Sequence, residues 1–192
     1  MTDATVSSHP TREWLVTAWA FSESLSWPLL PDMAVGSLAA GSSRGEAARL
    51  AACATVGSAL GALVHHRLAQ RGVGVPLPLT TPRMATAVDG WLNERGTAGF
   101  ARQPLSGVPH KLFVARAPAH GLGAGQVVAA TVVFRGPRLM ATALGAVTAR
   151  SVLQRGLGRF TSKAPVLARR SVAAACLGGF SLALVGMLRR WR

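Results

Sequence analysis

The sequence has few charged residues and very few acidic ones. Charged residues make up only 15% of its 192 positions, whereas soluble domains usually carry about 25%. Seven residues are acidic and 21 are basic, which gives a formal net charge of +14. The basic residues are spread among apolar runs instead of forming one polar face. The composition therefore argues against a nucleic-acid-binding protein and favours a membrane protein.

Motifs of metal binding and catalysis are missing. Cys53 and Cys176 stand alone in apolar runs, so we expect them to behave as small hydrophobic residues. The adjacent His65 and His66 would point to different faces of a helix and form a poor chelate. The sequence contains no Gly-rich phosphate loop, catalytic triad or metalloprotease motif. We therefore expect no enzyme, no metal site and no cofactor.

Long apolar segments are what the sequence has instead. Residues 171–188 carry no charge and are flanked by arginines, which predicts a transmembrane helix with its ends at the two interfaces. Residues 46–66 predict a second spanning helix, and residues 122–148 a third. Pro137 lies inside the third segment and predicts a kink or a break there.

Two short motifs lie in the second apolar segment. Ser43 and Glu46 have the spacing of a capping box, which predicts that the helix begins there. Gly57 and Gly61 form a GxxxG motif, which allows close approach of two helix backbones. Such motifs are common in small-residue helices, so the motif leaves homo-oligomerisation open.

Two further apolar segments are interrupted by proline and charge. Residues 14–40 contain prolines and carboxylates in mid-run, and residues 98–121 contain three prolines. Each consists of two short apolar arms around a break, the pattern of a re-entrant hairpin or a discontinuous helix. Paired broken segments in the two halves of a membrane protein indicate a binding site between them.

We therefore predict an all-α integral membrane protein. It would have about three spanning helices and two facing re-entrant helical hairpins in a pseudo-inverted-repeat arrangement. A membrane domain over residues 14–150 would follow an N-terminal tail. A polar linker containing an amphipathic helix would join the two halves of this domain. A basic amphipathic segment would precede the last spanning helix. The tail, linker and basic segment correspond to residues 1–13, 67–95 and 151–170. The basic residues are nearly balanced between the two sides, so they leave the orientation open.

Four basic residues lie inside sequence that otherwise resembles membrane segments. They are Lys111, Arg116, Arg135 and Arg138, all between Gly96 and Ala143. A cation at bilayer depth costs roughly 2.5–3.5 kcal/mol on insertion scales, so it must face protein, water or an anionic ligand. The first broken segment contains the opposite charges, Glu23 and Asp32.

These residues allow two interpretations. In the first, the four cations line one side of a polar cavity and bind a phosphate, while Glu23 or Asp32 takes up a proton. In the second, static salt bridges hold the two hairpins together. The cations in the membrane segments, six when Arg49 and Arg102 are included, outnumber the two carboxylates. This excess favours an anionic ligand.

Several segments together resemble the DedA family, also called the SNARE-associated Golgi protein or VTT-domain family, and most closely its short bacterial YqaA-like branch. The resemblance covers roughly residues 15–150 and rests on four stretches, ESLSWPLLPD, ATVGSALGALVHHRLAQRG, PLSGVPHKLFVARAPAHG and FRGPRLMATAL. It implies two facing re-entrant hairpins and movement of phospholipid or undecaprenyl phosphate between leaflets, in some members coupled to protons. By position, Glu23 and Asp32 match the acidic residues of the first hairpin. The usual Pro-Gly-Glu sequence of that hairpin is absent here, and His110 replaces a common aromatic residue.

The sequence thus predicts a multi-pass protein of the bacterial cytoplasmic membrane that moves lipids between leaflets. Its partners would be membrane lipids with anionic headgroups, bound by Lys111, Arg116, Arg135 and Arg138. Two alternatives stay open. One is a small-molecule exporter driven by protons, and the other is a membrane protein that supports envelope integrity without transport.

Overall fold

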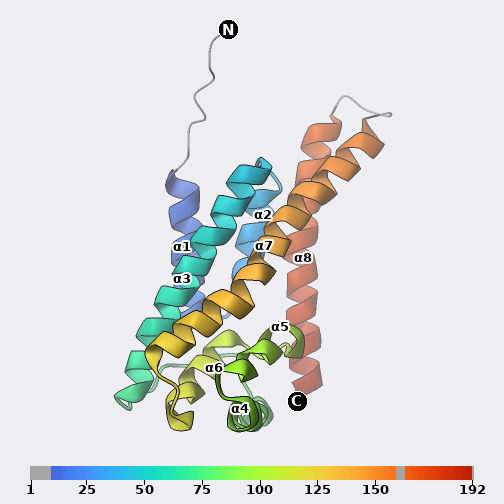
Figure 1. The fold of residues 1–192 in the computed structure, drawn as a ribbon. Coiled ribbons are helices and arrows are strands. Elements are labelled where there is room, and N and C mark those ends of the chain that lie inside the picture. Colours follow the sequence, from blue (N-terminus) through green and yellow to red (C-terminus); the bar gives the residue numbers. More distant parts are fainter. Residues whose placement is uncertain (1–9, 159–162, 192) are drawn as a thin grey trace.

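The chain folds into helices of very different lengths (Figure 1). The computed structural model describes residues 10–158 and 163–191, and no strand occurs among them. The longer helices are α1 (Pro10–Leu25), α2 (Pro31–Ala39), α3 (Arg44–Gln70), α4 (Pro82–Arg95), α7 (Ala124–Leu157) and α8 (Ala164–Trp191). Between α4 and α7 the chain forms four short helical turns, η1 (Gly96–Arg102), α5 (Gln103–Ser106), α6 (His110–Arg116) and η2 (Ala117–His120).

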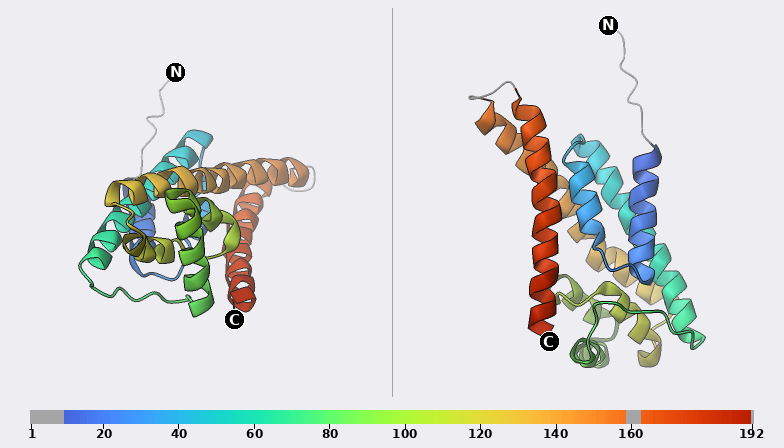
Figure 2. Two further views of the ribbon diagram at one scale, coloured as in Figure 1. Left: turned by 60° about the horizontal axis from the view of Figure 1, so that its bottom comes forward. Right: turned by 180° about the vertical axis from the view of Figure 1, so that it is seen from behind.

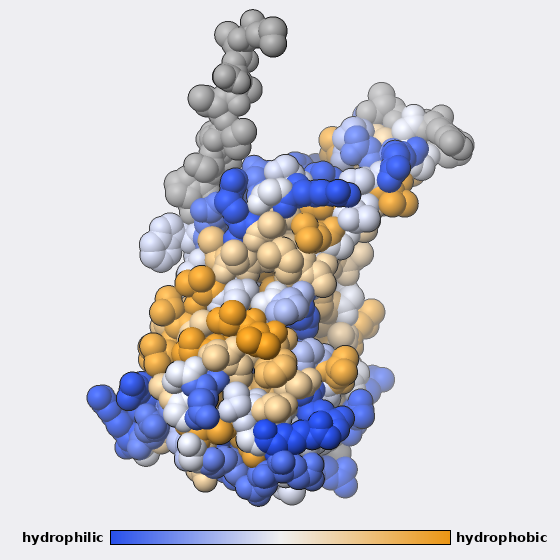
Figure 3. All heavy atoms as spheres, viewed as in Figure 1, coloured by the Kyte–Doolittle hydropathy of each residue, from blue (hydrophilic) through white to orange (hydrophobic). Residues whose placement is uncertain are grey.

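Three helices, α3, α7 and α8, are long and apolar enough to cross a membrane. They correspond to the three spanning helices that the sequence predicts. Figure 3 shows an apolar band on one face of the molecule, with hydrophilic residues gathered above and below it. A band of this kind between two polar ends is the surface expected of a protein embedded in a bilayer.

The GxxxG motif of α3 packs against α1 within the same chain. A Cβ atom at Gly57 would lie 2.3 Å from the Thr17 carbonyl oxygen, and one at Gly61 would lie 2.5 Å from the Phe21 carbonyl oxygen. The two glycines are four residues apart on α3, and the two carbonyl groups are four residues apart on α1. The two helix backbones therefore touch along one stripe. The motif therefore serves packing between α1 and α3 here.

Helices α1 and α2 make up the first broken segment. They run in opposite directions and are joined by residues 26–30 (Figure 2). The break arises because Pro28 and Pro31 cannot continue α1, and Pro31 then occupies the first turn of α2. The predicted break is confirmed, whereas a re-entrant position in a bilayer stays a prediction.

The second broken segment has a different form. Its prolines separate short helical turns, which lie together with α4 at one end of the molecule (Figures 1 and 2). Helix α4 is the amphipathic helix predicted in the linker, and it buries Met84, Val88 and Leu92 at four-residue spacing. The two broken segments thus differ in structure, and the inverted repeat stays a prediction.

Two expected boundaries differ in the structure, and one expected break does not occur. Helix α1 begins at Pro10, inside the expected tail, whose residues 1–9 lie outside the described part of the chain. Helix α7 continues through Pro137, so the chain does not break there, whereas the kink predicted as the other outcome stays a prediction. The described residues of the basic segment 151–170 form no separate helix. Its described residues end α7 and begin α8, and residues 159–162 lie outside the description.

We predict that Gly57→Ala destabilises the protein. The added Cβ would clash with backbone atoms of Thr17, and such overpacking typically costs about 1–3 kcal/mol. Thermal unfolding in detergent measures the loss. Gly145→Ala is the matched control, because a Cβ at Gly145 of α7 meets nothing within 4 Å. Equal melting temperatures for the two variants would contradict the packing of α1 on α3.

Candidate functional site

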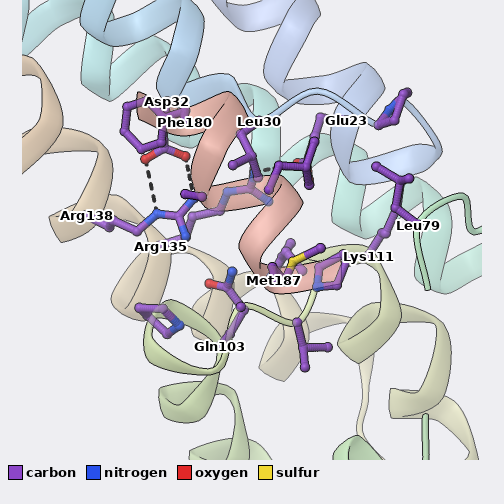
Figure 4. Close-up of a pocket in the computed structure, with 18 of the residues that line it drawn as sticks. Glu23, Leu30, Asp32, Leu79, Gln103, Lys111, Arg135, Arg138, Phe180 and Met187 are labelled. Carbon is purple, nitrogen blue, oxygen red and sulfur yellow. Dashed lines mark hydrogen bonds and ion pairs between the residues drawn. The ribbon is translucent and has the colours of Figure 1, made fainter. Parts of the chain in front are cut away.

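A cavity of about 270 Å³ lies where the two broken segments meet α7 and α8. Figure 4 shows charged side chains from α1, α2, α6 and α7 around it, with apolar side chains of α8 along one side. The charged lining residues are Glu23, Asp32, Lys111, Arg135 and Arg138. Five of the six residues predicted to form the site are therefore brought together.

Glu23 and Arg135 form a buried ion pair. A terminal nitrogen of Arg135 on α7 donates to Glu23 Oε2 on α1. Their side chains are only 1% and 3% exposed, for Arg135 and Glu23 respectively. Burying an isolated charge costs several kcal/mol, so each residue of the pair offsets the cost of burying the other.

A second ion pair joins α2 to α7. Arg138 donates to both carboxylate oxygens of Asp32, with a distance of 3.1 Å from Nε to Oδ1. The Thr142 hydroxyl, one helical turn further along α7, donates to Asp32 Oδ1 over 3.2 Å. Asp32 is fully buried, whereas the Arg138 side chain is 26% exposed. Arg138 is therefore the more accessible of the two arginines.

Lys111 binds the backbone at the break between α1 and α2. Its ammonium group donates to the carbonyl oxygens of Ser26 and Trp27, over 3.1 and 3.3 Å. These carbonyls follow directly after α1, where a helix leaves its last carbonyls unpaired and a cation is favourable. Lys111 therefore connects the second broken segment to the first, in addition to lining the cavity.

Arg116 does not line the cavity, contrary to the sequence prediction. Helix α6 ends at Arg116, and the side chain forms a two-bonded ion pair with Asp89 of α4, with 2.8 Å from Nε to Oδ1. His120 contacts the same carboxylate over 2.9 Å. The hydrogen bonds from Arg116, reinforced by His120, lower the pKa of Asp89 below its ordinary value. The Arg116 side chain is 44% exposed, so the pair belongs to the surface.

Polar groups around the cavity are left without partners. Of the Arg135 guanidinium, Nε and one terminal nitrogen are buried and have no hydrogen-bond partner among the described residues. Gln103 of α5 also lines the cavity, and its buried carbonyl oxygen has no such partner either. Buried polar groups are nearly always satisfied, so these atoms call for a ligand or water. Gln103 is uncharged, so a search for charged residues misses it. The sequence feature that could have identified it is a polar residue inside an apolar, proline-rich segment.

Three buried histidines lie on α3 and α6. His65 Nδ1 donates to the Ser24 carbonyl oxygen over 2.9 Å, and His66 Nε2 donates to the Leu122 carbonyl oxygen over 2.8 Å. His110, which lines the cavity, contacts the Thr131 hydroxyl over 3.0 Å. The adjacent His65 and His66 thus bind different parts of the chain, as expected from their positions on a helix.

Comparisons of the chain with protein-family models, with curated proteins and with solved structures find no match. The resemblance to the DedA family therefore stays a prediction.

We expect Glu23→Gln to destabilise the protein strongly. It leaves Arg135 buried without its partner, and breaking a buried pair on one side typically costs about 3–5 kcal/mol. The double variant Glu23→Gln/Arg135→Gln should recover most of this loss, because it removes both charges. Thermal unfolding in detergent measures all variants.

The control is Glu13→Gln, which breaks the exposed Glu13–Arg49 pair, 3.4 Å apart. Such pairs contribute about 0–1 kcal/mol. If Glu23→Gln were no more harmful than Glu13→Gln, the buried pair would not hold α1 to α7.

Proposed function

We propose that the protein moves phosphate-bearing lipids between the leaflets of a membrane, with the headgroup phosphate passing through the cavity. The observation that carries this proposal is the Arg135 guanidinium, buried at the cavity with two nitrogens unpaired. Arginine suits phosphate well, and the two unpaired nitrogens, Nε and the terminal nitrogen that Glu23 does not use, can each donate a charged hydrogen bond to a phosphate oxygen. Lys111 and Arg138 add positive charge, so three cations face two carboxylates around the cavity. That balance favours an anionic ligand over a cationic one.

The position of the cavity supports a lipid over a soluble anion. Phe180, Leu184 and Met187 of α8 line it on one side. Helix α8 is one of the three helices able to span a membrane, and most of its surface is exposed. The cavity is thus separated from the surrounding acyl chains by a single apolar helix. A lipid could place its headgroup among the charges while its tails stay in the bilayer.

Reconstitution into liposomes tests the proposal. Fluorescent phospholipid and labelled polyprenyl phosphate are the two substrates, and translocation is measured as access of a membrane-impermeant reagent to the label. We expect Glu23→Gln/Arg135→Gln to lose most of the activity, because it removes the guanidinium proposed to bind the phosphate. Arg116→Gln is the matched control, since it removes an arginine that does not line the cavity.

An unchanged rate in the double variant would refute the proposed site. Absence of lipid movement by the unaltered protein, together with substrate-induced proton flux, would favour the proton-driven exporter. In that case Glu23 and Asp32 would be the first carboxylates to replace.

A disulfide can test whether α8 must move to admit the lipid. A Cβ at Gly36 of α2 would lie 3.2 Å from Cys176 Cβ and 2.8 Å from its sulfur, close to the spacing of a disulfide. We expect oxidised Gly36→Cys to form this bond and to lose translocation, which a reductant should restore. Gly178→Cys, at an open position of α8, is the control. Full activity of the oxidised Gly36→Cys protein would rule out entry past α8.

A further inference from the structure

The end of the molecule opposite α4–α6 holds a second group of basic residues, at the far end of α2 from the cavity residue Asp32. The C-terminal end of α2, the last turns of α7 and the first turns of α8 lie at this end of the molecule (Figures 1 and 2). Two hollows of about 310 and 240 Å³ lie here. They adjoin, because Gly41 and Arg169 line both.

Four arginines from three long helices line the two hollows. They are Arg12 of α1, Arg150 of α7, and Arg169 and Arg170 of α8. Two of them have an evident structural role. Arg12 donates to the Leu38 carbonyl oxygen over 2.6 Å, and Arg150 donates to the Ala40 carbonyl oxygen over 3.3 Å. Both therefore satisfy carbonyls at the C-terminal end of α2, where cations are favourable.

The other two arginines have no such role. Arg169 and Arg170 form no ion pair with any residue in the described ranges, and no carboxylate stands among the described residues that line either hollow. Ser37 Oγ, in the wall of the first hollow, is buried without a hydrogen-bond partner, and so is Arg150 Nε in the second. The site therefore has surplus positive charge and unused donors.

Gly41 allows Arg169 to serve both hollows. A Cβ at Gly41 would lie 3.2 Å from Arg169 Cδ and 3.9 Å from a terminal nitrogen of Arg12. Without a side chain there, the stem of Arg169 crosses close to the backbone between the two hollows. Beside them, Val166 and Leu167 at the start of α8 are exposed, so the hollows border apolar surface.

We propose that this arginine cluster binds the phosphate of an anionic phospholipid at the membrane interface. Arginine forks match phosphate oxygens, and basic pockets between transmembrane helices are a known form of headgroup site. Phosphate is the shared chemistry of a lipid headgroup and a free anion. The exposed Val166 and Leu167 favour the lipid, because they offer apolar contact to its acyl chains. This site is independent of transport through the cavity.

Thermal unfolding of the full chain in a neutral detergent tests the proposal. Phosphatidylglycerol is added in increasing amounts, with phosphatidylcholine and inorganic phosphate as separate arms. For the unaltered protein we expect a concentration-dependent rise in melting temperature with phosphatidylglycerol and little change in the other two arms. The variant is Arg169→Gln/Arg170→Gln, and its control Arg189→Gln/Arg190→Gln removes two arginines from the opposite end of the same helix.

The two variants should respond differently. We expect Arg169→Gln/Arg170→Gln to need about tenfold or more phosphatidylglycerol for the same rise, since each lost charged hydrogen bond weakens binding. Arg189→Gln/Arg190→Gln should behave as the unaltered protein. Equal weakening in both variants would show general charge attraction and overturn the site, as would no weakening in either. An equal rise with inorganic phosphate would overturn the lipid as ligand and leave a free-anion site.

Discussion

The arrangement of the cavity depends on the need to neutralise charge inside an apolar band. Two carboxylates on the first broken segment meet two arginines of α7, and each pair joins segments more than 100 positions apart in sequence. The pairs fix α1 and α2 against α7, while Lys111 fixes the break between α1 and α2 to α6. The same charges thus hold the helices together and line the cavity.

This dual role explains why the static and the functional interpretations are not exclusive. Glu23 uses only part of the Arg135 guanidinium, and the remaining nitrogens stay buried without partners. A purely structural pair would be expected to satisfy both sides, because an unsatisfied buried donor costs about 1–3 kcal/mol. The unused donors at Arg135, and the unpaired Gln103 carbonyl nearby on the cavity wall, are the part of the arrangement that packing does not account for.

Much of this arrangement was predictable because acidic residues are so few. With only Glu23 and Asp32 in the first broken segment, a position opposite basic residues followed from the cost of burying charge, but their particular partners, Arg135 and Arg138, did not. The capping box at Ser43 was predictable too, because it depends on local spacing, and both of its hydrogen bonds form. Arg116 was not predictable in the same way. Its partner Asp89 lies on α4, and nothing in a single sequence indicates that the end of α6 packs there.

Helix α2 has a consequence for the depth of the cavity. Its nine residues span roughly 13 Å, less than half of a hydrocarbon core about 30 Å thick. Asp32 lies in the first turn of this helix, and arginines bind the carbonyls at its far end. If the arginines at its far end lie at a membrane interface, as proposed for the phospholipid site, the charged cluster around Asp32 lies one short helix away from that interface. For a polar group that crosses the apolar band, such a cluster would replace one long apolar path with two shorter ones.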